Sequence, residues 1–287
     1  MTQRYFPPQP QFSQPSQLST VFRPADELVT KEVPRLCISL EALDKCGKTH
    51  YALFTAPDPI CLVTNDTGTL HILKKACKLG RRIPHVLQLN YEHPPDVMRR
   101  QDIDTVMHET WKREWARYKE AMTVLAHEDP RSPDRTRTLV CDTMSELWSL
   151  CMLAHFGKIR SNPKHLYPAC NNDFTSVFWE LYKNRPDLNM ILIHRLKKEY
   201  KPNTKGEDAW TGNYECQGFN QIGYMVDLVL RSGWDPVYKL FYTEVDRVTR
   251  FGAEYVGQRM YGQRSSFGFL GLLMFPDTAL TPAIWGL

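Results

Sequence analysis

The 287-residue sequence lacks long apolar runs: the longest, Phe267 to Phe275, has nine residues and includes two glycines. A helix that crosses a membrane needs about 20 mostly apolar residues, so we expect no transmembrane segment and no membrane partner. The N-terminal residues also lack a basic start followed by an apolar core, which argues against a signal peptide. Together these absences predict a cytoplasmic protein.

The sequence also lacks a strong excess of one charge, because it has 36 Lys and Arg residues and 32 Asp and Glu residues, which give a net charge of +4. This balance does not by itself indicate a nucleic-acid partner, so any basic surface must be local. None of the eight cysteines forms a Cys-x-x-Cys pair, and several lie inside apolar runs. We interpret them as small buried residues of a reducing compartment rather than as a disulfide framework or a zinc site.

Composition divides the chain into three regions. Residues 1–30 form a predicted disordered arm, because its first part is rich in Pro, Gln and Ser and cannot bury enough apolar surface to offset its ordering entropy. Residues 31–250 carry recurring apolar runs and form the predicted core. Residues 251–287 are rich in Gly and aromatic residues and form a C-terminal tail that the sequence pattern does not place.

Short runs of Ile, Leu and Val recur along the core without polar alternation, which is typical of parallel strands buried on both faces. The runs are LCISL from Leu36, ICLVT from Ile60, HVLQL from His85, TLVCD from Thr138 and MILIH from Met190. Helix-like segments separate them, so we predict an α/β fold with a mostly parallel sheet flanked by helices.

Two further elements follow from residue spacing. The clearest helix spans residues 103 to 127, where large side chains at intervals of three and four residues form one core-facing stripe. The members of this stripe are Met107, Trp111, Trp115, Tyr118, Met122 and Leu125. Later, the runs MVDLVLR and VYKLFYTEV predict an antiparallel hairpin with its turn near residues 233–236.

One short loop carries the strongest chemical signal. After the strand that begins at Leu36, the pattern Ala42-x-x-x-x-Gly47-Lys48-Thr49 fits a phosphate-binding P-loop, and a helix-like segment follows. Glycine allows close backbone approach, the lysine reaches the β and γ phosphates, and the hydroxyl binds Mg²⁺. We therefore predict binding of ATP and Mg²⁺. The expected nucleotide-binding residues are Leu43, Asp44, Lys45, Cys46, Gly47, Lys48 and Thr49.

A P-loop also needs a carboxylate on a neighbouring strand to position the metal ion. The apolar run TLVCD ends in Asp142, which we predict to hold Mg²⁺ together with Thr49. An Asp at the end of a strand can instead cap the helix that follows. The P-loop earlier in the chain favours the metal role.

Other P-loop classes match less well. The chain has no Asn-Lys-x-Asp motif, which a GTPase uses to read its base, and no clear Arg-rich lid of a small-molecule kinase. A typical AAA motor carries Glu directly after the strand Asp, whereas Thr143 follows Asp142 here. The remaining pattern resembles the RecA-like core, and specifically the phage RecA-like ATPases linked to single-strand annealing. The segments that carry this resemblance are LEALDKCGKTHYAL, ICLVTNDTGT, LVCDTMSEL, and MILIHRLKKEY followed by TGNYECQGFNQIGYMVDLVLR.

The resemblance implies roles by position. Asp66 would be the general base that orients the attacking water, at a place where the family has an acidic residue and RecA itself has the longer Glu, and Glu146 is the alternative. His194 ends the strand that carries a γ-phosphate sensor in the family, so it would donate a hydrogen bond to that phosphate. A satisfied buried histidine is the alternative interpretation of His194. The expected catalytic set is therefore Lys48, Asp66, Asp142 and His194.

The family also binds single-stranded DNA through loops that follow the Asp142 and His194 strands. Residues 152–172 contain no acid, and residues 195–205 carry five basic residues and one acid beside aromatic residues. Lysine and arginine attract phosphates, and aromatic rings stack on bases, although a short basic loop can also be merely solvated. The predicted DNA-binding residues are Lys158, Arg160, Lys164, Lys197, Lys198, Tyr200 and Lys201.

Three functions therefore stand at this point. The first is an ATPase that binds single-stranded DNA and promotes annealing or recombination. The second is a nucleotide-gated, non-catalytic platform in a replication or packaging complex, and the third is a nucleotide or metabolite kinase. The candidate partners beyond DNA are a single-stranded-DNA-binding protein and further copies of the chain. If the protein is phage-encoded, the expected location is the host cytoplasm.

Overall fold

A computed structural model describes residues 34–91, 105–158, 164–202, 208–219, 221–249, 253–276 and 285. The predicted arm over residues 1–30 lies outside these ranges, and so does Arg160. Within the described residues, no helix combines the length and apolar character that crossing a membrane requires. The predicted boundaries at residues 30 and 250 stay predictions.

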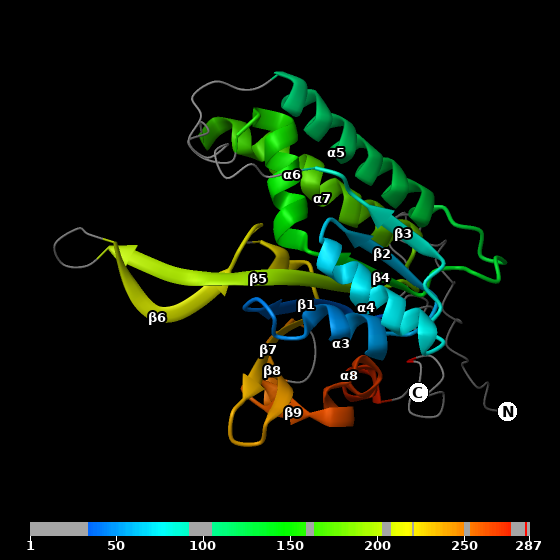
Figure 1. Ribbon diagram of the computed structural model, residues 1–287, viewed down its shortest axis with the longest axis vertical. Helices are drawn as coiled ribbons and strands as arrows, with labels where there is room; N and C mark the ends of the chain where they lie inside the picture. The colour runs from blue at the N-terminus through cyan, green and yellow to red at the C-terminus, as the bar shows by residue number, and fades with distance from the viewer. Residues whose placement is uncertain are drawn as a thin grey trace, which may run out of the picture. The chain divides into compact units, whose positions relative to one another are not determined.

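One nine-stranded sheet organises the described chain (Figure 1). Its order is β3-β2-β4-β5-β1-β7-β8-β9, with β6 paired to β5 beside this path. Neighbouring strands from β3 to β7 are parallel, whereas the β5–β6, β7–β8 and β8–β9 pairs are antiparallel. The strands are β1 (Cys37–Ala42), β2 (Ile60–Thr64), β3 (His85–Gln88), β4 (Thr138–Asp142), β5 (Asn189–Pro202), β6 (Asp208–Cys216), β7 (Leu228–Asp235), β8 (Leu240–Val248) and β9 (Arg259–Tyr261). The predicted α/β fold with late antiparallel strands is confirmed.

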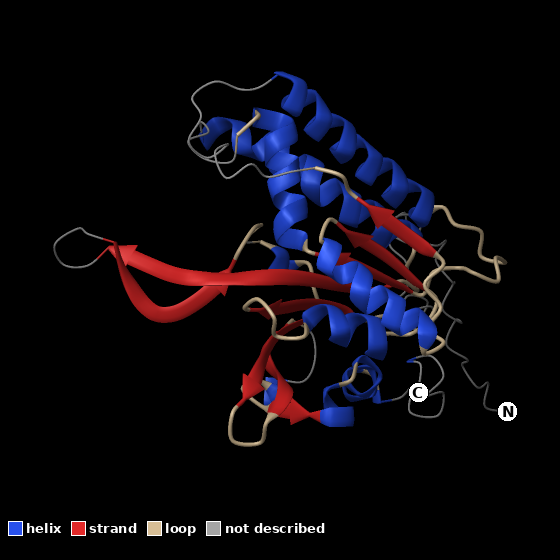
Figure 2. Cartoon of the chain, in the orientation of Figure 1, coloured by secondary structure: helices blue, strands red, loops and turns tan. Residues whose placement is uncertain are grey.

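Helices cover both faces of the sheet (Figure 2). On one face lie α5 (Thr105–Ala126), α6 (Met144–Phe156) and α7 (Tyr167–Asn184). On the other lie α3 (Lys48–Thr55), α4 (Thr67–Lys78) and α8 (Phe267–Met274). The parallel strands are therefore buried on both sides, which is why their sequences show continuous apolar runs instead of alternation.

The predicted stripe on α5 is confirmed. Trp111, Trp115 and Tyr118 are almost completely buried, and Met122 and Leu125 continue the same cluster one and two turns later. These side chains pack against α6 and α7, so α5 covers those two helices from outside. Because the residues recur at helical spacing, the sequence alone was sufficient to predict this packing face.

Strand β5 differs from its prediction. The apolar run ends near His194, but the strand continues through the basic residues to Pro202 and pairs with β6. Residues 195–202, predicted as a loop, are therefore one half of an exposed two-stranded ribbon. We call residues 195–202 of β5 together with β6 the β5–β6 ribbon. Apolar periodicity could not reveal this strand, because neither of its faces is packed against the core.

The second predicted DNA loop is also largely helical. Helix α6 extends to Phe156, the 3-10 turn η1 covers Lys164–Leu166, and α7 begins at Tyr167. Only the segment between Gly157 and Lys164 connects these elements, and residues 159–163 lie outside the described ranges.

Part of the unplaced C-terminal region packs on the core. Phe267 and Leu270 of α8 are fully buried in the core cluster that includes residues of β1 and α3. Trp285 is also fully buried there and stacks on Phe275, with ring centroids 5.5 Å apart. Gly271 permits this arrangement, because a Cβ at that position would lie 2.4 Å from the Trp285 ring.

Candidate nucleotide-binding site

The phosphate loop joins β1 to α3, as the sequence predicts. Gly47 stands at the N-cap of α3 with φ 76°, a left-handed conformation that glycine adopts without steric cost. Its carbonyl accepts the first helical hydrogen bond from the Tyr51 amide at 2.8 Å. The loop therefore leaves the first backbone N–H groups of α3 unpaired within the helix, and such groups bind anions.

Lys48 lies inside this loop. Its side chain is buried, and its Nζ donates to the Ala42 carbonyl at 2.9 Å and to the Leu43 carbonyl at 2.7 Å. Burial is the largest influence on its pKa and lowers it, while the nearby Asp44 carboxylate acts in the opposite direction. An ammonium group has three donors, so one remains for a phosphate oxygen.

Asp142 ends β4 and meets two threonines from other elements. Its Oδ2 accepts from Thr49 Oγ1 at 2.8 Å and from Thr69 Oγ1 at 2.7 Å. Burial raises the pKa of Asp142, and the two hydroxyl donors partly offset that rise. A buried carboxylate beside a threonine hydroxyl is the hard oxygen donor set that Mg²⁺ prefers, so Thr49 and Asp142 fit the predicted metal site.

An open cleft connects these groups, with about 250 Å³ accessible to water-sized molecules. Both the P-loop and the start of α4 contribute to its walls. The lining residues are Asp44, Lys45, Cys46, Gly47, Lys48, Thr49, His50, Asp66, Gly68, Thr69, Ile72, Asp142, Thr143 and Arg195. The fold therefore brings six of the seven predicted loop residues together with Asp66 and Asp142.

Asp66, the predicted base, is also the N-cap of α4. Its Oδ1 accepts from the Gly68 amide at 2.8 Å, while the side chain lines the cleft. It is close enough to Asp142 to contribute to that residue's raised pKa. Among the described residues, no hydrogen bond to Asp66 Oδ2 is present, so this oxygen can accept from a water molecule in the cleft.

Glu146, the alternative base, forms an ion pair instead. Its Oε1 accepts from Arg195 Nη1 at 2.5 Å, and Arg195 Nε lies 3.7 Å from Asp44 Oδ1. Arg195 thus links α6 to the phosphate loop and lines the cleft. Sequence reasoning counted Arg195 only among the basic residues of a loop. Its position directly after the predicted sensor residue was the signal that could have identified it.

His194 is buried and does not line the cleft. Its side chain is 1% exposed, and Nδ1 lies 3.1 Å from Ser39 Oγ and 3.0 Å from the Leu192 carbonyl. Burial lowers the pKa of His194 to about 4, so the imidazole is neutral near pH 7. Its buried Nε2 has no hydrogen-bond partner among the described residues. Of these two consecutive residues, Arg195 therefore lines the cleft and His194 does not.

The predicted DNA-binding residues separate into different environments. On the β5–β6 ribbon, Lys198 Nζ lies 4.9 Å from the centroid of the Trp210 ring, and Tyr200 pairs with Trp210 across the strands. Lys197 and Lys201 form ion pairs with Glu215 at 3.1 Å and with Glu199 at 2.8 Å. In the other predicted segment, Lys158 follows the end of α6 and Lys164 begins η1.

The phosphate loop, the contact between Thr49 and Asp142 and the parallel strands beside them are together typical of a P-loop nucleotide-binding protein. Residues 36–266 match the family described as AAA domain, and the chain belongs to that family. Thr143 stands where a typical AAA motor carries Glu, and this difference therefore does not exclude the chain from the family. Among solved structures, the chain is similar to the crystal structure of the RadB recombinase, with 14% identity and a TM-score of 0.44 over 85% of this chain and 94% of that chain. No curated protein matches the chain.

Proposed function

We propose that the protein is a Mg²⁺-dependent ATPase that binds single-stranded DNA. The observation that carries the ATPase part is the contact between Thr49 and Asp142, which joins the phosphate loop to the end of β4. This contact places a hydroxyl and a carboxylate beside Lys48, at the point where a nucleotide's β and γ phosphates would lie. Mg²⁺ bound to these groups and to the phosphates would neutralise negative charge as the γ-phosphoryl group is transferred.

The remaining residues of the cleft have separate parts in this proposal. The N–H groups at the start of α3 and the third donor of Lys48 hold the phosphates. Asp66 Oδ2 accepts a proton from the attacking water or orients it, with Glu146 as the alternative base. Arg195 provides a further cation at the cleft beside Lys45 and Lys48, and an arginine in that role stabilises charge that develops during phosphoryl transfer.

The DNA part of the proposal rests on the two unlike faces of the β5–β6 ribbon. Cross-strand partners share a face, so Lys198, Tyr200, Trp210 and Tyr214 lie together on one side. Tyr200 and Trp210 are 53% and 48% exposed, and we call these four residues the aromatic face. These four residues include one cation, and Asp208 lies on the same side at the end of the ribbon, opposite Pro202. The bases of a DNA strand can stack on the aromatic rings while its phosphates meet Lys198.

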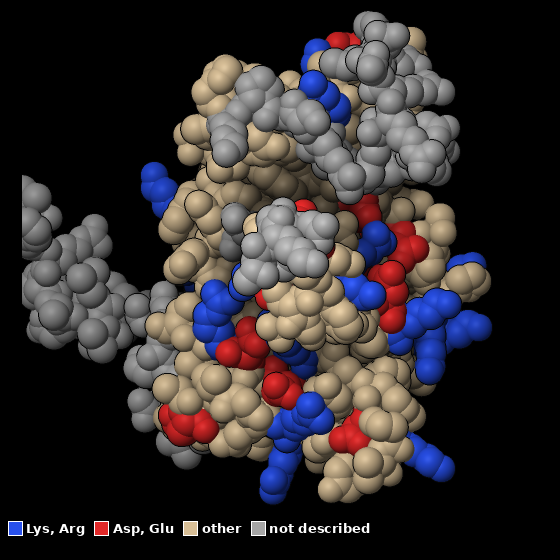
Figure 3. All heavy atoms as spheres, turned by 90° about the vertical axis from the view of Figure 1, so that its left-hand side faces the viewer, with Lys and Arg blue, Asp and Glu red and all other residues tan. Residues whose placement is uncertain are grey.

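The opposite face of the ribbon has the charges of both signs. Lys197, Glu199, Lys201 and Glu215 pair with one another, and Thr211 Oγ1 donates to Glu199 at 2.8 Å. Figure 3, which views the molecule from the side toward which the ribbon projects, shows Lys and Arg side chains interleaved with Asp and Glu side chains on that side. A mixed surface attracts phosphates less than a uniformly basic one, so we assign DNA contact to the aromatic face.

The test is ATP hydrolysis by the full chain with and without single-stranded DNA. We expect hydrolysis that requires Mg²⁺ and that rises when DNA is added. The Trp210→Ala variant should need a higher DNA concentration for half-maximal stimulation, whereas Thr211→Ala, on the opposite face, should resemble the native chain. Nucleotide binding without hydrolysis would overturn the ATPase part in favour of a nucleotide-gated platform. Phosphoryl transfer to a small acceptor, without DNA dependence, would favour a kinase.

We further propose that the DNA-bound protein promotes annealing or recombination, and that copies of the chain or a single-stranded-DNA-binding protein assist it. The resemblance to annealing-linked ATPases supports this use. Pairing of two complementary oligonucleotides, measured by fluorescence energy transfer, should accelerate in the presence of the protein. An unchanged pairing rate at saturating protein would overturn the annealing role while leaving the ATPase proposal intact.

A further inference from the structure

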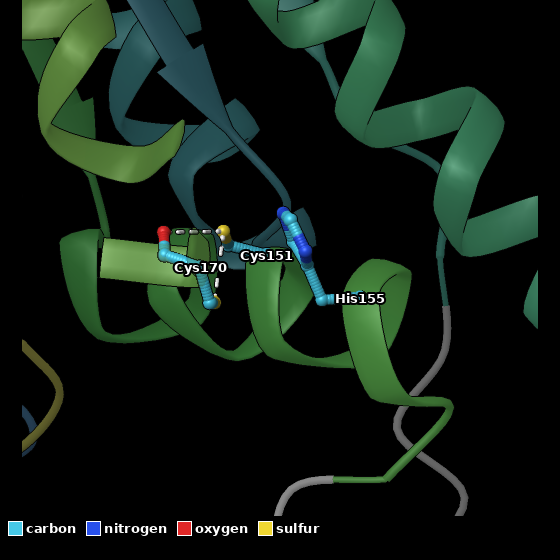
Figure 4. A group of neighbouring side chains, drawn as sticks. All are labelled: Cys151, His155 and Cys170. Atoms are coloured by element: carbon cyan, nitrogen blue, oxygen red, sulfur yellow. Dashed lines mark hydrogen bonds between the residues drawn. The ribbon is translucent and has the colours of Figure 1, made fainter. Parts of the chain in front are cut away.

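A second cluster of ligand-type side chains lies on the helical side of the sheet, and none of its members lines the nucleotide cleft. Cys151 and His155 are four residues apart on α6, so both project from one side of that helix. Cys170 comes from α7. One ligand atom from each residue lies within 4.8 Å of the others, and Figure 4 shows the three side chains converging.

The two sulfur atoms are already at a distance that suits a shared metal ion. Cys151 Sγ lies 3.5 Å from Cys170 Sγ, and both side chains are buried. With zinc–sulfur bonds of about 2.3 Å at a tetrahedral angle, two thiolates would lie about 3.8 Å apart. A bound ion would therefore require only a small shift of the two cysteine side chains.

His155 is oriented by the carboxylate of Asp173, which is not a member of the cluster. His155 Nε2 lies 2.9 Å from Asp173 Oδ2, and Asp173 also accepts from Trp115 Nε1 at 2.7 Å and from Lys119 Nζ at 2.9 Å. Ligating histidines in metal sites usually have such a carboxylate partner, because it fixes the ring and raises its basicity. An imidazole with one nitrogen on a carboxylate keeps the other for a metal.

Cysteine binds zinc as a thiolate, and both cysteines of this cluster are buried. A divalent ion would compensate for the charge of the two thiolates, and its binding would release protons. The His155 side chain is 28% exposed, which gives an ion a path to the buried sulfurs.

We propose that Cys151, His155 and Cys170 bind Zn²⁺, with water as the fourth ligand, and that the ion joins α6 to α7. Two thiolates and an imidazole are the ligands that zinc prefers, whereas Mg²⁺ prefers oxygen. The site is therefore chemically distinct from the nucleotide cleft. The sequence argued against zinc because no cysteines form a Cys-x-x-Cys pair, but here the fold assembles the ligands from two helices.

The experiment uses the reduced, metal-free full chain titrated with Co²⁺, which reports a tetrahedral thiolate site through its visible absorption. We expect one Co²⁺ per chain, displacement by Zn²⁺ and no displacement by excess Mg²⁺. Cys170→Ser should abolish the tetrahedral spectrum. Cys77→Ser, which alters an exposed cysteine outside the cluster, should leave it unchanged. Asp173→Asn should weaken metal affinity by about 10- to 100-fold, as loss of an outer carboxylate does in other metal sites.

His155→Gln keeps the test valid if a buried cysteine variant fails to fold, because His155 is partly exposed. We expect this variant to fold and to bind Co²⁺ at least about tenfold more weakly. The absence of a tetrahedral spectrum in the folded native chain would overturn the proposal. An unchanged spectrum in both His155→Gln and Cys170→Ser would also overturn it. So would a Cys151–Cys170 disulfide found by mass mapping of the chain as isolated, since the pair would then be a redox pair.

Discussion

The nucleotide cleft and the β5–β6 ribbon build binding surfaces in opposite ways. The cleft is lined by residues from the P-loop, α4, β4 and β5, and its buried side chains are held in place by hydrogen bonds to one another and to the backbone. The ribbon projects away from the helical layers, and its side chains interact mainly across two strands (Figure 1). Loss of one group should therefore disable the cleft, whereas ribbon contacts should contribute independently and respond to salt.

The largest expected effect on ligand binding is at Lys48, and it should affect the nucleotide cleft without affecting the ribbon. Lys48→Ala should weaken ATP binding by about 10- to 150-fold, because a hydrogen bond to a charged group contributes about 1.5–3 kcal/mol. DNA binding measured without nucleotide should be unaffected. Fluorescence titration with a labelled ATP analogue and anisotropy with a labelled oligonucleotide would measure the two affinities. The control is Lys74→Ala on the exposed surface of α4. Equal ATP affinity in both variants would contradict the assigned role of Lys48.

The next prediction tests whether different residues of the cleft are responsible for nucleotide binding and for ATP hydrolysis. Asp142→Asn should retain nucleotide binding but lose about a hundredfold or more in kcat, because metal positioning contributes several kcal/mol to phosphoryl transfer. Steady-state hydrolysis at saturating ATP and Mg²⁺ provides the measurement. Native turnover in this variant would move the metal role away from Asp142.

Comparison of Asp66→Asn with Glu146→Gln in the same assay identifies the catalytic base. Substitution of the residue that acts as the base should reduce kcat without reducing ATP affinity.

On the ribbon, the aromatic residues should dominate affinity. Trp210→Ala should weaken single-stranded DNA binding by about 5- to 150-fold, because stacking contributes about 1–3 kcal/mol per base. Stacking releases no counterions, so the slope of log affinity against log salt should stay the same. Anisotropy titrations at several salt concentrations measure both quantities. A flatter slope in Trp210→Ala would show that the variant had altered phosphate contacts instead.

A smaller effect distinguishes the two faces of the ribbon. Lys198→Ala should reduce the salt slope by about 0.7, the value for one phosphate contact on a single strand. Lys197→Ala should change it less, because Glu215 already pairs with that lysine. If Lys197→Ala had the larger effect, DNA would bind on the charge-paired face, and our assignment of the aromatic face would be wrong.

The smallest expected effect is on stability, again at Asp142. Burial raises the folded-state pKa of this carboxyl, so the native protein retains a proton that the unfolded chain has lost. Stability should therefore fall as pH rises from about 4, the unfolded value, through the raised native pKa. Asp142→Asn removes this dependence and should be more stable than the native chain near pH 7. Urea unfolding of the nucleotide-free proteins at a series of pH values would test this, and an equal pH dependence would contradict it.

The local sequence was sufficient to predict those elements in which the residue types themselves indicate burial or ligand binding. The apolar runs predicted β1, β2 and β4 within one or two residues, because strands buried on both faces must be apolar throughout. The P-loop was equally visible, since its glycine, lysine and threonine are consecutive and each is needed for phosphate and metal binding. Asp142 could be inferred because strands of a parallel sheet present their carboxyl ends on the same edge.

Tertiary structure alone decided which side chains meet. Thr69 contacts Asp142 across 73 residues of sequence, and Arg195 reaches Glu146 across 49. The ribbon was hidden because its strands are exposed on both faces and have no apolar period. Cys151 and Cys170 look like ordinary core cysteines until α6 and α7 bring their sulfurs together. Such contacts depend on how helices and strands pack together. Packing brings together residues that are far apart in the sequence, and no local sequence pattern indicates that they will meet.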